Sequence, residues 1–139
     1  MIISEKKTSL CSSEQVASLL KHILSLEDAA SQEREHFWAI GLNAKNVTKY
    51  IELVSLGSLT ASLVHPRELF RLAIEHSCAA MLIGHNHPSG DPKPSQEDIL
   101  LTRRLAQGGT LLGIKVLDHI IIGEDSHFSF RDSGMMTEV

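Results

Sequence analysis

The chain has 139 residues, of which 42% are hydrophobic and 22% charged, as is usual for a single globular domain with one core. Its formal net charge of −4 provides no general basic surface for a nucleic-acid backbone. No apolar run approaches the roughly 20 residues that a membrane-spanning helix needs, and the start, MIISEKKTSL, lacks the apolar core of a signal peptide. Cys11 and Cys78 form no CxxC pair. We therefore expect one domain over residues 1–139, in the reducing cytoplasm and without a membrane partner.

The first half of the chain predicts one helix followed by strands. In SSEQVASLLKHILSL the apolar residues recur at helical spacing, and Ser12 with Gln15 is typical of a capping box at the start of a helix. The runs HFWAIGLN and YIELVSLG are typical of strands, and the AKNVTK between them indicates a hairpin. TASLV, residues 60–64, predicts a third short strand.

The second half predicts two helices on either side of a buried strand. Residues 66–77 begin with a proline at a plausible first helical position, and residues 95–109 predict a helix closed by the glycine pair at its end. Between these helices AAMLIG is wholly apolar, which is typical of a buried central strand. Residues 114–123 and 127–130 predict two further strands. The order α-βββ-α-β-α-ββ indicates one sheet with helices packed against it.

The most distinctive chemistry lies in GHNHPSGDPKPSQED, residues 84–98. His85 and His87 follow the predicted central strand, and side chains two residues apart on a strand point to the same face. Proline and glycine stiffen the turn that follows, and Asp98 falls in the first turn of the next helix. Two imidazoles and one carboxylate are a ligand set that catalytic zinc uses, with a fourth position left for water.

These residues also have a simpler structural interpretation. Ser95 and Asp98 form S-x-x-D, which caps a helix without any metal, and the pair taken alone favours capping. A single histidine at the end of a strand is more often structural or merely exposed. The combination of HxH with a first-turn carboxylate across a rigid loop favours the metal site. A Ser95 hydroxyl at the helix start is compatible with both roles.

HNHPSGDPKPSQED fits H-x-H-P-x6-S-x2-D and so resembles the zinc signature of the JAMM (MPN+) metalloproteases, most closely their RadC-like branch. The resemblance covers about residues 33–134 and is preceded by the amphipathic helix at about 12–27. It implies an α/β fold with a central mixed β-sheet and helices packed on it, a cytidine-deaminase-like α/β/α sandwich. Two features differ. Asn86 stands where deubiquitinase members carry serine or threonine, and the sequence resembles short forms that lack the helix-hairpin-helix region.

The resemblance also implies roles for individual residues in the motif. His85, His87 and Asp98 match the ligands of one zinc ion per chain. Ser95 matches the serine that polarises the substrate carbonyl and stabilises the oxyanion.

Other roles depend on residues outside the motif. The family's general base matches Glu35, and Glu33 is the alternative because few residues anchor the alignment there. Without the resemblance, Glu35 would be interpreted as a solvated carboxylate at the start of a strand. Asp118 and His119 either support the ligating histidines through hydrogen bonds or are simply a pair near the end of a strand.

The function implied by the resemblance is that of a zinc-dependent metallopeptidase or isopeptidase, which hydrolyses an amide bond in a peptide or protein substrate. Two alternatives stay open: a DNA-repair-associated module and an inactive, metal-bound MPN interaction module. Basic residues are scattered, and only one Trp and one Tyr are available for stacking, so tight nucleic-acid binding is not expected. The missing P-C-x-x-C half disfavours a zinc deaminase. The sequence predicts neither a particular substrate nor an oligomeric state.

Overall fold

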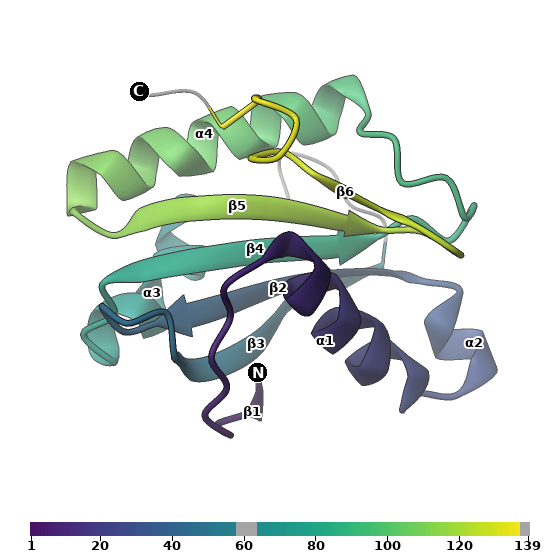
Figure 1. Ribbon diagram of the computed structural model, residues 1–139, viewed down its shortest axis with the longest axis horizontal. Coiled ribbons are helices and arrows are strands. Elements are labelled where there is room, and N and C mark those ends of the chain that lie inside the picture. The colour runs from purple at the N-terminus through teal and green to yellow at the C-terminus, as the bar shows by residue number, and fades with distance from the viewer. Residues whose placement is uncertain (58–63, 137–139) are drawn as a thin grey trace.

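The computed structural model of the chain describes residues 1–57 and 64–136. In these residues four helices accompany one mixed sheet of six strands (Figure 1). In chain order the elements are β1 (Ile2–Ser4), α1 (Ser13–Ser25), α2 (Ala29–Gln32), β2 (Glu35–Leu42), β3 (Thr48–Gly57), α3 (Pro66–Glu75), β4 (Ala80–Asn86), α4 (Gln96–Leu112), β5 (Lys115–Ile122) and β6 (His127–Ser129). The strand order is β1-β3-β2-β4-β5-β6, so β4 is an interior strand. It pairs antiparallel with β2 and parallel with β5.

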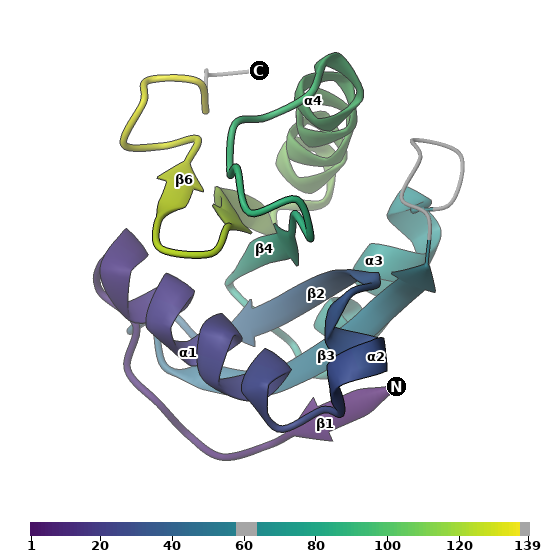
Figure 2. The same cartoon turned by 90° about the vertical axis from the view of Figure 1, so that its right-hand side faces the viewer.

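Helices cover both faces of the sheet, as Figure 2 shows. On one face α1 buries Val16, Ala17 and Leu20 against the sheet. On the other face α3 and α4 pack on Phe37, Met81 and Ile83 among others. The architecture is therefore the expected α/β fold with helices on a central mixed sheet. No helix within residues 1–57 and 64–136 combines the length and apolar character required to span a membrane.

The predicted elements are largely confirmed. The hairpin of β2 and β3, the helices α1 and α3, the buried strand β4 and the strands β5 and β6 all form where the sequence predicts them. Ser12 caps α1 by accepting from the Gln15 N–H, although the Gln15 side chain accepts from Cys11 N rather than from Ser12 N. The third strand predicted at TASLV falls mainly on residues outside the described ranges. Strand β1 and the single turn α2 were not predicted.

One helix boundary was predicted wrongly. Helix α4 continues through Gly108 and Gly109 and ends at Leu112, where Gly113 adopts the left-handed conformation with φ 74° and caps the helix. Gly109 instead serves close packing between α4 and β5. A Cβ atom there would lie 2.5 Å from the carbonyl oxygen of Ile114. The glycine pair therefore marks a point where backbone approaches backbone, and not the end of the helix.

This packing predicts that Gly109→Ala destabilises the protein. Alanine favours a helix over glycine by up to about 1 kcal/mol, but the added methyl group meets a backbone oxygen that cannot turn away. We expect a net loss of about 1–3 kcal/mol in the free energy of unfolding, measured by urea denaturation. Gly108→Ala is the matched control because its methyl group meets side chains and no backbone atom, the nearest being the Phe70 ring at 3.3 Å and Pro66 Cβ at 3.8 Å. Equal urea midpoints for the two variants would contradict the close-packing explanation.

Candidate metal centre

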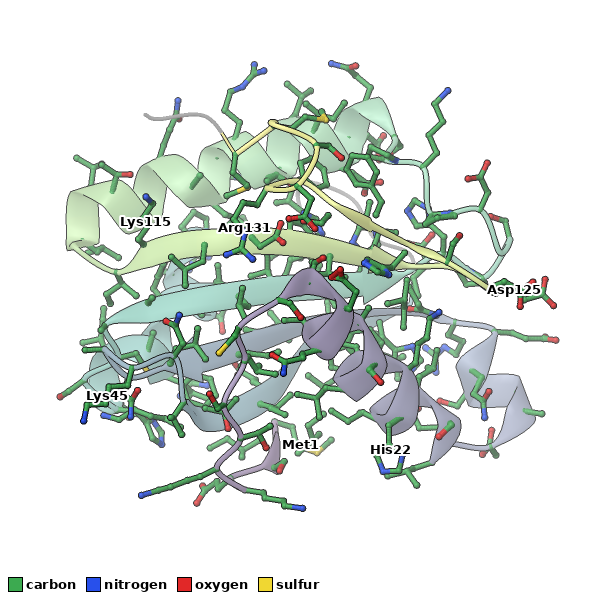
Figure 3. The ribbon with its side chains drawn as sticks, viewed as in Figure 1. Met1, His22, Lys45, Lys115, Asp125 and Arg131 are labelled. Carbon is green, nitrogen blue, oxygen red and sulfur yellow. The ribbon has the colours of Figure 1, made fainter. Side chains whose placement is uncertain are left out.

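The candidate site lies where β4 ends and α4 begins. Strand β4 continues through His85 to Asn86, and the His87 N–H extends the pairing with β5 by donating to the Ile122 carbonyl at 2.9 Å. The Gly90 N–H then closes a turn on the His87 carbonyl, with Gly90 at φ 95°. This end of the sheet also carries the turn between β5 and β6, where Figure 3 labels Asp125. The loop returns the chain to α4, whose first turn contains Asp98.

The structure brings His85, His87 and Asp98 together. His85 Nε2 lies 3.0 Å from His87 Nε2 and 3.2 Å from Asp98 Oδ1, and His87 Nε2 lies 3.1 Å from Asp98 Oδ2. Two ligands at about 2.0–2.1 Å from a tetrahedral zinc ion are about 3.3 Å apart. The three donor atoms therefore match the spacing around a single small ion, and these residues could hold a metal.

Hydrogen bonds behind His87 set which ring nitrogen faces the cluster. His87 Nδ1 lies 2.9 Å from the backbone carbonyl of Asp91. A carbonyl oxygen can only accept, so Nδ1 carries the hydrogen. In the neutral ring, the lone pair is then on Nε2, which points at the cluster.

A longer chain of hydrogen bonds has the same effect on His85. The Thr102 hydroxyl donates to the Asp98 carbonyl at 2.7 Å, so it must accept from His119 Nδ1, 2.5 Å away. Complete burial, reinforced by His85, lowers the pKa of His119 well below its usual range, so its neutral ring has only that one N–H. His119 Nε2 must therefore accept from His85 Nδ1, 2.7 Å away. The lone pair of neutral His85 is left on Nε2.

Three hydrogen-bond acceptors consequently converge on one point. They are Nε2 of His85, Nε2 of His87 and the Asp98 carboxylate, and without a proton or cation among them they would repel one another. The hydrogen bond with Asp98 raises the pKa of His87, against the opposing effect of burial. Burial by itself would raise the pKa of Asp98, but a ring that carries a proton on Nε2, His85 or His87, donates it to the carboxylate and holds that pKa below its usual range. The cluster thus favours positive charge at its centre, as a cation site requires.

Ser95 and Asp98 also form the capping box of α4. Ser95 Oγ accepts from Asp98 N at 3.1 Å, and Asp98 Oδ2 accepts from Ser95 N at 2.8 Å. Both interpretations of the pair therefore hold geometrically, since the carboxylate that caps the helix also faces the histidines. The Ser95 hydroxyl uses a lone pair in this box, which leaves its proton able to reach an outside acceptor.

Glu35, at the start of β2, lies beside this cluster. A hollow of about 300 Å³ is lined by Glu35, His87, Pro88, Ser89, Ser95, Glu97 and Asp98. Glu33 lines a separate hollow of about 570 Å³ between α1, α2 and the turn at Gly123, which shares His87 and Pro88 with the first. The position of Glu35 with Ser95 and Asp98 in one hollow favours it over Glu33 for a role beside the metal.

Asp118 and His119 have different surroundings. His119 contacts His85 directly, as a supporting residue would. Asp118 faces away and accepts hydrogen bonds from the Ser129 hydroxyl and from Arg131 N, so it fixes β6 and the segment after it. Sequence reasoning missed Thr102, whose only local signal is a position four residues after Asp98 on the same helix.

Comparison with known proteins identifies the relatives of this chain. Residues 10–135 match the family described as "RadC-like JAB domain". The chain is 52% identical over 113 residues to a UPF0758 protein of Desulforamulus reducens, and 46% identical over 134 residues to UPF0758 protein Mbar_A2303 of Methanosarcina barkeri. These alignments cover 81% and 96% of this chain but only 50% and 56% of the relatives. The chain thus spans about half the length of the curated relatives it matches.

The hydrogen-bond chain behind His85 predicts that Thr102→Val weakens metal binding. Valine keeps the shape of the side chain but leaves the His119 N–H without an acceptor, so His119 and His85 lose their fixed orientation. We expect zinc affinity, measured by chelator competition, to fall about 10–100-fold. Thr110→Val is the matched control, because Thr110 makes the same kind of bond, to the Ala106 carbonyl, on the exposed side of α4. Equal affinities in the two variants would show that Thr102 does not orient the site.

Proposed function

The chain belongs to the RadC-like JAB domain family, and from this we propose that it is a zinc-dependent metallohydrolase of the JAMM type. The reaction is hydrolysis of an amide bond, in a peptide or an isopeptide. The observation that carries the proposal is the convergence of two imidazole lone pairs and a carboxylate in a hollow that Glu35 and Ser95 also line.

The ligand set favours zinc over the harder cations. Magnesium and calcium prefer six or more oxygen ligands, whereas His85, His87 and Asp98 offer two nitrogens and one carboxylate, one ion per chain. Three protein ligands leave the fourth position of a tetrahedral ion open, which is typical of catalytic zinc. A zinc ion held by these residues would supply a nucleophile at neutral pH, since zinc lowers the pKa of bound water to about 7.

Glu35 is the general base in this proposal. Its carboxylate takes a proton from the attacking water and passes it to the leaving amine, which departs as a neutral molecule. The pKa of His87 is raised mainly by hydrogen bonds with Asp98 and with the Asp91 carbonyl. The negative charge of Glu35 makes a smaller contribution in the same direction, so Glu35 acts electrostatically on the cluster. Glu35 lines the same hollow as His87 and Asp98 but is not one of the three clustered donors, as a general base beside the metal would be placed.

Ser95 stabilises the negative charge that develops on the substrate carbonyl oxygen. Its hydroxyl lines the hollow and is oriented by the Asp98 N–H, which leaves its proton available to the substrate. Loss of one such donor lowers kcat by about 10²–10³ in other hydrolases. The same serine therefore starts helix α4 and contributes to catalysis.

The substrate partner that we propose is a peptide or protein segment. His87 and Pro88 line both hollows, so a peptide bound in either one would lie beside the candidate metal ligands. Tight binding of nucleic acid is not part of the proposal because the net charge is −4. We propose the cytoplasm as the compartment, in keeping with the unpaired state of Cys11 and Cys78.

Metal analysis tests the ligand assignment. Chelator-free protein incubated with zinc should bind close to one equivalent, and Asp98→Asn should lose most of it because an amide is a poor zinc ligand. Glu97→Gln is the matched control, since Glu97 is the neighbouring carboxylate in the same helical turn and lines the same hollow. Less than half an equivalent in the wild type after adding zinc, measured by atomic emission, would overturn the proposal. So would equal zinc content in Asp98→Asn and Glu97→Gln.

Replacement of Glu35 by Gln tests the role of the base. Glutamine keeps the shape of the side chain but takes no proton at neutral pH. Glu35→Gln should therefore retain zinc while hydrolysis of a peptide library, followed by mass spectrometry, falls by about 10²–10⁴. Glu33→Gln is the control and should keep wild-type rates. Full activity of Glu35→Gln with zinc bound would remove Glu35 from the mechanism. If Glu33→Gln lost activity instead, Glu33 would be assigned as the general base.

A further inference from the structure

The Asn86 side chain holds the backbone on both sides of Glu35. Its Oδ1 accepts from the His36 N–H at 2.6 Å, and its Nδ2 donates to the Arg34 carbonyl at 3.0 Å. These are the two residues that flank Glu35. Asn86 is only 3% exposed, so little water competes for these hydrogen bonds.

These two hydrogen bonds of Asn86 lie where strands β2 and β4 separate. The pairing between β2 and β4 ends at Phe37 and His85. Strand β4 nevertheless stays paired with β5 as far as Asn86 and Ile122. Beyond Phe37 the start of β2 thus has no backbone pairing to β4, and the Asn86 amide takes its place. The hollow lined by Glu35, His87 and Asp98 lies at this end of the two strands.

Asn86 cannot itself be a ligand, because of its direction. Side chains alternate along β4, so Asn86 points to the face opposite that of its neighbours His85 and His87. On that face the His36 ring strengthens the same connection. Its Nδ1 contacts the Arg34 carbonyl at 2.7 Å, and its Nε2 contacts Glu27 Oε1 at 2.9 Å, before α2. Asparagine suits this position because one side chain supplies both an acceptor and a donor.

We propose that Asn86 is the positioning residue for the general base, fixing the distance between the Glu35 carboxylate and the metal. It does so by holding the Arg34 carbonyl and the His36 N–H to the end of the strand that carries His85. The inference rests on the proposed function, which assigns Glu35 as the base. It also gives a role to a position at which the sequence differs from the deubiquitinase members.

The test compares Asn86→Ala with Asn43→Ala in the full chain. Asn43 also makes two side-chain bonds to backbone, accepting from Lys45 N at 2.8 Å and Val47 N at 3.0 Å. It lies in the turn between β2 and β3, where Figure 3 labels Lys45 at the end of the sheet away from Asp125. Asn43→Ala therefore controls for the general loss of two hydrogen bonds. Asn86→Asp, which keeps the acceptor and the shape but not the donor, is the second variant in case Asn86→Ala fails to fold.

Three measurements separate positioning from simple stability. Hydrogen exchange at the His36 amide should become faster in Asn86→Ala, while zinc content stays at the wild-type level. With a cleavable peptide, kcat should fall about 10–100-fold at unchanged KM, since misplacement by about 1 Å costs up to about 10²-fold. Asn43→Ala should change none of these. Loss of zinc in Asn86→Ala, or wild-type kcat with fast exchange at His36, would overturn the inference.

Cobalt in place of zinc provides a readout that needs no substrate. The visible absorption of the cobalt-loaded protein changes with pH, and a neighbouring carboxylate raises the midpoint of that change because negative charge favours the protonated form. Glu35→Gln should lower the midpoint, and Asn86→Ala should lower it partway. An unchanged midpoint in Glu35→Gln would contradict the proposed function. A midpoint that shifts in Glu35→Gln but stays at the wild-type value in Asn86→Ala would overturn the role of Asn86 alone.

Discussion

The physical constraint on which the site depends is the direction of two imidazole lone pairs. Each histidine has its Nδ1 hydrogen committed to an acceptor behind it: the Asp91 carbonyl for His87 and the His119 ring for His85. With Nδ1 held in this way, the Nε2 atoms face each other and the Asp98 carboxylate. An arrangement of three mutually repelling acceptors costs stability unless a cation lies among them. The surrounding hydrogen bonds therefore favour a cation at the cluster, either a proton or a metal ion.

The fold provides this arrangement through three contacts at one end of the sheet. The parallel pairing of β4 with β5 places His119 beside His85. Helix α4 carries Asp98 and Thr102 one turn apart. Asp98 is the candidate ligand, and Thr102 accepts from His119, which in turn orients His85. The separation of β2 from β4 leaves space for Glu35. The hydrogen bonds that join His119 to His85 and to Thr102 span 34 and 17 residues of the chain, so the site requires both the pairing of β4 with β5 and the packing of α4.

Much of the fold and of the site could be predicted from local patterns. The spacing of His85, His87 and Asp98 predicts their meeting because a strand end and a helix start have few possible geometries. The roles of Asp118 and His119 were harder to predict. Alternation along the strand shows that only one of them faces His85, but which one depends on the pairing register of β4 with β5. Gly109 was misinterpreted because a glycine that ends a helix and one that allows close packing look alike in sequence. Strand β1 has three residues and depends on pairing with Ile51 and Glu52, far along the chain.

The residues of the site are also residues of the fold, and this limits what the chain can change. Asp98 accepts the Ser95 N–H at the start of α4 with the same carboxylate that faces the histidines. A helix start satisfied in this way orients the ligand at no further entropic cost, because the carboxylate is already ordered. A residue that replaced Asp98 would therefore have to do two things: accept the Ser95 N–H at the start of α4 and offer a donor atom to the histidines. A metal ion held at the cluster would therefore be coupled to the docking of α4 through one side chain: the ion would stabilise the helix, and the ordered helix would hold the carboxylate in place for the ion.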